Sequence, residues 1–294
     1  MHYTVLSAYE AWKNRPKEAP PPAAQFGQIP LLELPPQDNS LVFNYKLETV
    51  TGTFPKLPDR ALVFVNNIPK SNLLDVNKGT VQANKLNFTG SGEAYKPPLY
   101  RWRTATGVSG ILEMNVTRDT FDVIYDWPRN ETVYVDPLRK FVPEMQIVNS
   151  ATSALQRAGV WDADWQKGKR AIIPYRFVNG QLLRVDHQNK ADYFQVNFQR
   201  TPLVENFDFV TADPYRPVVW VLVSRLRTQV AEIHYAYQPI DTKTSGEYGL
   251  KPVSQVWEEL INGKAYISSI GENFPGQEVI IRHFSLAYYQ SHQE

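Results

Sequence analysis

The chain has 294 residues, enough for two domains of ordinary size that each bury a core. Its 31 basic and 30 acidic residues leave a formal net charge of +1, and the two signs alternate along the sequence, which argues against nucleic acid or an anionic membrane surface as a partner. Cysteine is absent, which excludes disulfides, thiolate catalysis and zinc or iron–sulfur sites built on cysteine.

Proline dominates residues 1–40, which we expect to form a juxtamembrane linker. Seven of the 22 prolines lie in the first 36 residues, a density that favours extended polyproline conformation and a semi-rigid spacer. Tyr3, Tyr9 and Trp12, followed by Lys13 and Arg15, are typical of the aromatic girdle and basic flank at the end of a membrane helix. The pattern favours a membrane helix upstream of residue 1 and an extracytoplasmic location. An ordinary frayed helix explains the same residues equally well.

Residues 41–136 are expected to form a first α+β domain. Alternating apolar and polar residues over 41–47 predict a half-buried strand. Ser71 is expected to cap a helix that runs to Leu86, although Gly79 weakens the helical pattern. Residues 117–119 are short enough to join two strands in a hairpin. The other strands of this domain are predicted at 61–65, 99–103, 111–116 and 120–127.

Residues 137–294 are expected to form a second α+β domain. A helix with one apolar stripe should begin after Pro143 and end at Gly159. Asn179 and Gly180 predict a tight hairpin turn within residues 175–184. Residues 218–223 are apolar on both faces, which indicates a strand at the centre of a sheet. Further strands are predicted at 193–198 and 230–237.

The last forty residues predict one helix followed by two strands. Residues 252–263 carry a single apolar stripe on a 3.6-residue period, with Trp257 at its centre, so we expect Trp257 to be buried. Residues 264–270 and 278–289 read as the strands. The fold class is therefore α+β, with mostly antiparallel sheets, each covered by one or two short helices, in two consecutive domains.

The familiar catalytic motifs are missing from this sequence. Residues 89–93 form a glycine-containing turn without the lysine of a phosphate-binding loop, and no Gly-x-Ser-x-Gly nucleophile elbow occurs. None of the five histidines pairs at the short spacings that bind metals. His234 and His283 lie among apolar residues of predicted strands, where each is expected to be a hydrogen-bonded, half-buried histidine; the alternative is that they meet across a sheet. We therefore predict no catalytic site, cofactor or metal.

Residues 161–165 hold two carboxylates between two tryptophans. Trp161, Asp162, Asp164 and Trp165 offer hard oxygen ligands and stacking faces, which suit calcium or a sugar. The segment lacks the third ligand and the glycine of an EF-hand loop. A helix-to-strand connection with both tryptophans packed against the core is the favoured interpretation. Together with His234 and His283, these four residues are the candidate ligand or partner contacts.

Three C-terminal segments resemble extracytoplasmic domains of uncharacterised bacterial proteins. Residues 231–241, 252–266 and 282–289 share a general helix and strand pattern with the YycH/YycI family, membrane-anchored accessory proteins that modulate a sensor kinase. The resemblance covers roughly residues 200–290. It implies an upstream membrane helix, an extracytoplasmic location and a protein partner, and it carries no catalytic motif.

The sequence therefore favours a non-enzymatic extracytoplasmic interaction or regulatory module that is membrane-anchored in its natural form. A cell-envelope enzyme acting on glycan or peptide is the first alternative, because catalytic residues can lie far apart in a sequence. A structural subunit of a surface assembly is the second.

Overall fold

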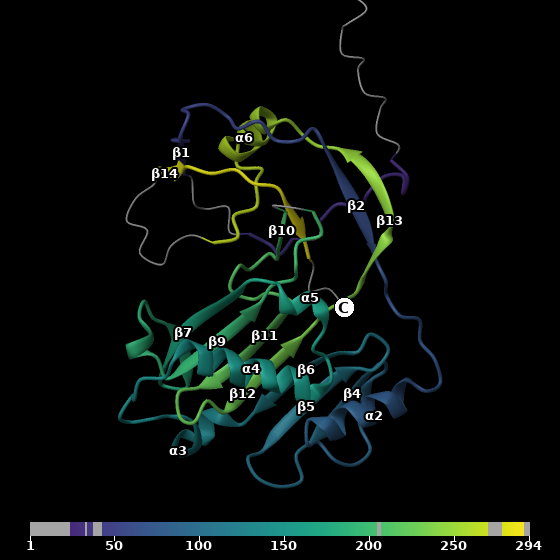
Figure 1. Ribbon diagram of the computed structural model, residues 1–294, viewed down its shortest axis with the longest axis vertical. Helices are drawn as coiled ribbons and strands as arrows, with labels where there is room; N and C mark the ends of the chain where they lie inside the picture. The colour runs from purple at the N-terminus through teal and green to yellow at the C-terminus, as the bar shows by residue number, and fades with distance from the viewer. Residues whose placement is uncertain (1–23, 33, 38–42, 205–206, 270–277, 291–294) are drawn as a thin grey trace, which may run out of the picture.

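The computed structural model describes residues 24–32, 34–37, 43–204, 207–269 and 278–290. Its main feature is a nine-stranded antiparallel sheet with α2 (Asp75–Lys85) and α4 (Glu144–Ala158) on one face (Figure 1). The α+β class with mostly antiparallel pairing is thereby confirmed. In order across the sheet, the strands are β3 (Glu93–Lys96), β4 (Leu99–Arg103), β5 (Gly110–Asn115), β6 (Thr120–Tyr125), β12 (Val230–Tyr235), β11 (Val219–Ser224), β9 (Tyr193–Phe198), β7 (Arg170–Val178) and β8 (Gln181–Arg184).

This sheet takes strands from both sides of the domain boundary expected at residue 136. β6 pairs with β12 in antiparallel register, with Asp122 opposite His234 and Phe121 opposite Tyr235. The expected division into domains 41–136 and 137–294 is therefore not confirmed, since hydrogen bonds of one sheet join the two ranges.

Local turn signals predicted two hairpins of the sheet correctly. β5 and β6 are joined through residues 117–119, and Asn115 lies opposite Thr120. Asn179 and Gly180 have φ angles of 51° and 82° and connect β7 to β8. Two successive positive φ angles give a turn whose twist matches that of the flanking strands.

The two central helices follow their sequence signals with one correction. α4 begins after Pro143 and ends at Gly159, whose φ of 73° is the left-handed conformation expected there. α2 begins three residues later than expected, because Leu74 occupies the capping position that was expected for Ser71. Gly79 lies inside α2 and is buried.

Strands at the centre of the sheet are buried on both faces. All six residues of β11 are buried, which confirms its central place, and so are all six residues of β9, its neighbour in the sheet. α4 packs on one face of β9 and β11. On the other face, Trp127 and Tyr134 pack with Trp220. Trp127 belongs to η1 (Trp127–Arg129) and Tyr134 to α3 (Glu131–Tyr134). Two further short helices are α5 (Ala163–Gln166) and η2 (Gln188–Lys190).

A smaller set of elements stands beyond one end of the large sheet (Figure 1). Three strand pairs and α6 form it, and two of the pairs are parallel. The pairs are β1 (Asn44–Leu47) with β14 (Glu278–Ile281), β10 (Asp208–Val210) with β15 (Ala287–Tyr289), and β2 (Arg60–Asn66) with β13 (Ile240–Gly249); the helix is α6 (Val253–Ile261).

The C-terminal strands differ from the prediction. Residues 264–269 form no strand, and residue 270 lies outside the described ranges. The strand expected over 278–289 is divided into β14 and β15, which pair with different partners. Periodicity identified the extended segments but gave no information on the long-range pairing that divides them.

α6 is present as expected, but it is less buried than its apolar stripe suggested. No residue of α6 is buried, and Trp257 is half-buried with its ring 6.1 Å from that of Phe54. The apolar face of α6 is therefore partly in contact with solvent.

Part of the expected linker lies in the described ranges. Phe26 N–H donates to the Tyr248 hydroxyl at 2.8 Å, and the two rings stack with centroids 6.4 Å apart. The Gln37 side chain donates to the Ile267 carbonyl at 2.6 Å. Residues 24–37 thus contact the folded body where they are described, and residues 1–23 lie outside the described ranges.

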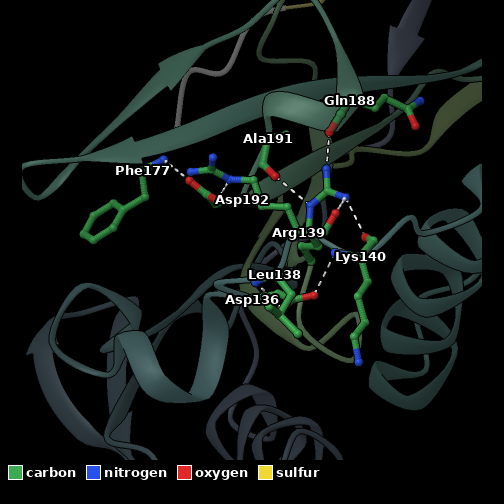
Figure 2. Close-up of polar contacts among 9 residues, drawn as sticks. Asp136, Leu138, Arg139, Lys140, Phe177, Gln188, Ala191 and Asp192 are labelled. Carbon is green, nitrogen blue, oxygen red and sulfur yellow. Dashed lines mark hydrogen bonds and ion pairs between the residues drawn. The ribbon is translucent and has the colours of Figure 1, made fainter.

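A buried guanidinium connects the segment before α4 to the sheet. Arg225 is 4% exposed and donates to the backbone carbonyls of Ala191 and Lys140, both at 2.7 Å (Figure 2). It also donates to the Gln188 carbonyl, and burial lowers the pKa of its guanidinium. Arg225 therefore satisfies carbonyls of two loops that would otherwise be buried without partners.

Two buried carboxylates complete this polar network. Asp192, 2% exposed, accepts hydrogen bonds from Arg139 Nε and from Phe177 N–H, both at 3.0 Å (Figure 2). Asp136 accepts from the backbone N–H groups of Leu138 and Lys140, also at 3.0 Å. Because each charged group has close partners, the network is a structural anchor and no candidate for binding chemistry.

Replacing Arg225 with methionine should lower the free energy of unfolding by about 3–5 kcal/mol, since it leaves several buried carbonyls without donors. Urea denaturation measures the change. The control is Arg227→Met at an exposed position two residues away, which should change stability by less than about 0.5 kcal/mol. Equal losses in the two variants would contradict an anchoring role for Arg225.

Candidate functional site

A cleft of about 650 Å³ opens beside α2, and its size lies within the range of ligand sites. Residues of α2, the β5–β6 turn, the connection from α4 to α5, and β12 line it. The lining residues are Leu74, Asn77, Lys78, Val81, Gln82, Lys85, Asp119, Gly159, Val160, Trp161, Asp162 and Tyr235.

One face of α2 forms a wall of this cleft. Leu74, Lys78, Val81 and Lys85 recur at three- and four-residue intervals, which places them on the same side of the helix. Leu74 and Val81 are apolar, yet 60% and 57% of their surfaces are exposed. The wall therefore presents two accessible apolar side chains with a lysine beside each.

The opposite face of α2 is held closely against the sheet. Asp75, Gly79 and Ala83 are buried there. A Cβ at Gly79 would lie 2.6 Å from Val116 Cγ1, so only glycine permits this approach. The Asp75 carboxylate accepts from Thr117 Oγ1 at 3.2 Å, which fixes the start of the helix to the β5–β6 turn.

The second wall is the chain that leaves α4. The left-handed Gly159 ends the helix, and Asp162 then caps α5 by accepting a hydrogen bond from Asp164 N–H at 3.1 Å. Gln82 of α2 donates to the Ala158 carbonyl, which joins the two walls directly. The positions of both walls are therefore set by hydrogen bonds in which side chains take part.

Tyr235 and Asp119 contribute the inner surface of the cleft. Tyr235 is 7% exposed and its ring stacks on Phe121 at 5.2 Å. Burial raises the pKa of the Tyr235 phenol; Tyr237, Asp162 and Asp119 raise it further, and the charge of Arg200 opposes the rise. Partial burial raises the pKa of the Asp119 carboxyl, while the charge of Lys78 opposes that rise. Burial is therefore the main influence on both titratable groups of this surface.

Only part of the tryptophan and aspartate segment, residues 161–165, lines the cleft. Trp161 and Asp162 line it, whereas Trp165 is completely buried and packs edge-to-face on Tyr237 at 4.9 Å. The expectation that the tryptophans pack against the core is correct for Trp165. Trp161 is half-buried, with its ring 5.7 Å from that of Phe198.

Asp164 has a structural partner instead of a place in the cleft. Its carboxylate accepts from the buried Arg200 guanidinium at 2.8 Å and from the Tyr237 hydroxyl at 2.7 Å. In the described ranges, no group of three or more His, Cys, Asp or Glu side chains is arranged to hold a metal ion. Asp162 and Asp164 thus face different surroundings and do not form one ligand set.

The two candidate histidines lie in different parts of the fold. His234 belongs to β12 of the large sheet, where its Nδ1 donates to Asp122 Oδ1 at 2.6 Å and its ring stacks on Trp220 at 5.6 Å. His283 is exposed and lies between β14 and β15, so the strand position expected for it is wrong. The structure does not bring the pair together across one sheet.

Glu232 lies two residues before His234, on the same face of β12. Burial raises the pKa of its carboxyl; the hydrogen bond from Trp127 Nε1 at 2.7 Å and the charge of Arg216 oppose this, and Asp122 adds to it. This face is opposite to the one covered by α2 and α4, because side chains alternate along a strand. His234, Asp122 and Glu232 therefore form a second polar cluster, separate from the cleft.

Sequence reasoning missed Lys78, Val81, Asp119 and Tyr235. Each belongs to an element that was predicted, but their convergence depends on the packing of α2 and on the pairing of β6 with β12. The spacing of Leu74, Lys78, Val81 and Lys85 was the available signal, because it places apolar and charged residues on one helix face.

Replacing Glu232 with glutamine should make the protein more stable at neutral pH. The folded-state pKa of Glu232 is above the unfolded value of about 4.3, so its favourable contribution is present below that pH and is lost as the pH rises through the folded pKa. Glutamine keeps the acceptor for Trp127 and removes the charge. Denaturant unfolding at several pH values should show a gain at pH 7 that disappears in acid. The exposed Glu258→Gln is the control, and a gain that does not vary with pH would contradict this cause.

Within the described ranges, no helix combines the length and the apolar character that crossing a bilayer requires. Comparison of the chain with protein-family models, with curated proteins and with solved structures finds no match.

Proposed function

We propose that the protein is a non-enzymatic interaction module that binds a segment of a partner protein in the cleft along α2. The observation that carries this proposal is the pair of exposed apolar residues, Leu74 and Val81, on the helix face that lines the cleft. Single exposed apolar residues are common on protein surfaces, but these two are aligned within one concave site.

Burial of this pair would supply binding energy. Covering a Leu or Val side chain that is otherwise in water contributes up to about 1.5–3 kcal/mol, and these two are already partly covered. A helix face that alternates apolar and charged groups suits a peptide segment, whose own side chains supply both kinds of contact.

The charges around the cleft also favour a protein segment. Lys78 and Lys85 lie on the helix wall, while Asp119 and Asp162 belong to the other elements that line the cleft. This balance provides no continuous basic surface of the kind that binds a nucleic acid backbone. It suits a partner that carries charges of both signs.

The regulatory part of the proposal rests on the sequence. The proline-rich residues 1–40, the aromatic and basic residues near the start, and the resemblance to the YycH/YycI family support a membrane-anchored protein outside the cytoplasm. A module of this kind would present the cleft to a partner beside the same membrane.

Selection of random linear peptides on the immobilised protein tests the binding site. Val81→Glu should lower the affinity of the selected peptides by about tenfold or more, equivalent to about 1.4 kcal/mol, because it places a carboxylate on the apolar wall. Fluorescence anisotropy with labelled peptides measures the affinities. Leu138→Glu, an exposed apolar position outside the cleft, is the matched control. Peptides that bind both variants as well as wild type would rule out this cleft.

A cell-envelope enzyme is the second candidate, favoured by the Asp122–His234 pair and the raised pKa of Glu232 beside it. An acid–base reaction would use these groups on the open face of the sheet. If this candidate is right, turnover of a wall glycan or peptide is detectable in the wild type and falls by about 100-fold or more in His234→Gln. Wild-type protein without turnover of such substrates would leave the binding proposal as the better account.

A further inference from the structure

We propose that a groove along α4, the α4 groove, binds an extended acidic segment of a protein, with a carboxylate of that segment on Arg157. The groove has a volume of about 510 Å³, which lies within the range of ligand sites. Its walls are one face of α4 and the turn between β11 and β12, and it shares no lining residue with the cleft beside α2. The inference therefore goes beyond the proposed function and does not depend on it.

The first wall is a row of side chains along α4. Met145, Asn149, Ser153 and Arg157 recur every four residues, which places them on one side of the helix. None of the four is among the buried residues by which α4 packs on the sheet. The row is therefore open to a ligand along its whole length.

The second wall is the turn between β11 and β12, which is fixed to α4 by a residue in a strained conformation. Thr228 has a φ angle of 49°, which β-branched residues rarely adopt. Its Oγ1 accepts a hydrogen bond from Ser150 Oγ at 2.9 Å, and its hydroxyl donates to the Arg227 carbonyl at 2.8 Å. The Thr228 hydroxyl thus joins the turn to the helix, and the groove between them is formed without a ligand.

The charge of the α4 groove favours an anion. Arg157 is the only charged side chain among the described residues that line it. Arg157 is exposed, and no carboxylate in the described ranges forms an ion pair with it. Its charge acts on the phenol of Tyr125, whose pKa burial raises, so that phenol supplies no neutralising charge at neutral pH. The cleft beside α2 differs in this respect, because its two lysines are balanced by two aspartates.

Arg157 also has a structural role that is compatible with binding. It lies in the last turn of α4, where a cation interacts favourably with the helix dipole. That interaction does not use the planar fork of N–H donors, which matches the two oxygens of a carboxylate. A carboxylate of a ligand would therefore add to the contacts of Arg157 without replacing any.

The neutral polar residues favour a peptide as the carrier of this carboxylate. Gln146 and Asn149 are exposed, and their side-chain amides offer both donors and acceptors, as the backbone of an extended peptide does. No aromatic side chain is among the described residues that line the groove, so it lacks a flat apolar surface on which a sugar ring would pack.

The length of the groove sets the size of the segment. Met145 and Arg157 lie at opposite ends of the row, and their twelve-residue separation on α4 corresponds to about 18 Å. An extended chain covers that distance in about five or six residues. Met145 is 74% exposed, so an apolar residue of the segment would pack on it while an acidic residue reaches Arg157.

Selection of random linear peptides on the immobilised Val81→Glu variant tests this inference. The substitution impairs the cleft beside α2 and lies outside the α4 groove. The selected peptides should be rich in aspartate and glutamate. Their affinities, measured by fluorescence anisotropy, should fall as the salt concentration rises, because ions screen an exposed charge pair.

Two further substitutions in this variant identify the residues responsible. Arg157→Gln should lower the affinity of the selected peptides by about tenfold or more, because it removes a charge-assisted hydrogen bond. Arg103→Gln, at an exposed position on β4, is the matched control and should leave the affinity unchanged. Asn149→Ala should lower the affinity by about threefold through the loss of a neutral hydrogen bond. Alanine favours the helix more than asparagine does, so unfolding would not explain that loss; Gln156→Ala, an exposed position of α4 outside the groove, is its control.

The inference is overturned if no peptide is selected, if the selected peptides show no excess of acidic residues, or if they bind Arg157→Gln unchanged. Glucuronic acid, titrated into the isotope-labelled protein and followed by NMR, tests an acidic sugar instead. Arg157-dependent binding of this sugar without selection of acidic peptides would also show that the peptide is the wrong ligand. Peptides selected on the wild type that depend on Val81 test the proposed function separately, so either proposal can fail alone.

Discussion

The antiparallel pairing of β6 with β12 positions both candidate sites. It brings together Asp122 and His234, which are 112 positions apart in the sequence. The same pairing joins strands β3–β6 to strands β7–β9, β11 and β12 in one nine-stranded sheet. A shift of one residue in this register would exchange the faces of every side chain on the shifted strand. Burial of Phe121, Val123, Ile233 and Tyr235 in the core beneath the helices opposes such a shift. The hydrophobic pattern of two short strands thus determines where the functional groups lie.

The two faces of this strand pair present different chemistry. On the face covered by α2 and α4, Tyr235 stacks on Phe121 and reaches the cleft. On the other face, His234 contacts Asp122 beside Glu232. The first face is concave because a helix and a loop rise beside it, and concavity is what allows a ligand to be surrounded. For this reason the cleft is the stronger candidate for binding, although the open face holds the closer pair of titratable groups.

Local signals were sufficient to predict most elements, but they could not predict how those elements combine. Gly159, the Asn179–Gly180 turn and the apolar run of β11 each identified a feature that the structure contains. The strand expected over 278–289 was instead divided, and the boundary at residue 136 was crossed by one sheet, because both depend on pairing between distant segments. The candidate site shows the same limit: Trp161 and Asp162 were identified within one short segment, whereas Asp119 and Tyr235 come from two other elements.

The contacts that fix α2 to the rest of the fold indicate that the cleft is formed before a ligand binds. Gly79 brings the helix close to the sheet, Asp75 ties its start to Thr117, and Gln82 bridges to the end of α4. Both walls are therefore fixed by contacts that do not involve a ligand. A preformed site loses little conformational entropy on binding, so even modest contacts contribute to affinity. Selectivity would then come from where the fixed charges lie: Lys78 and Lys85 are on α2, whereas Asp119 and Asp162 are on the other elements that line the cleft.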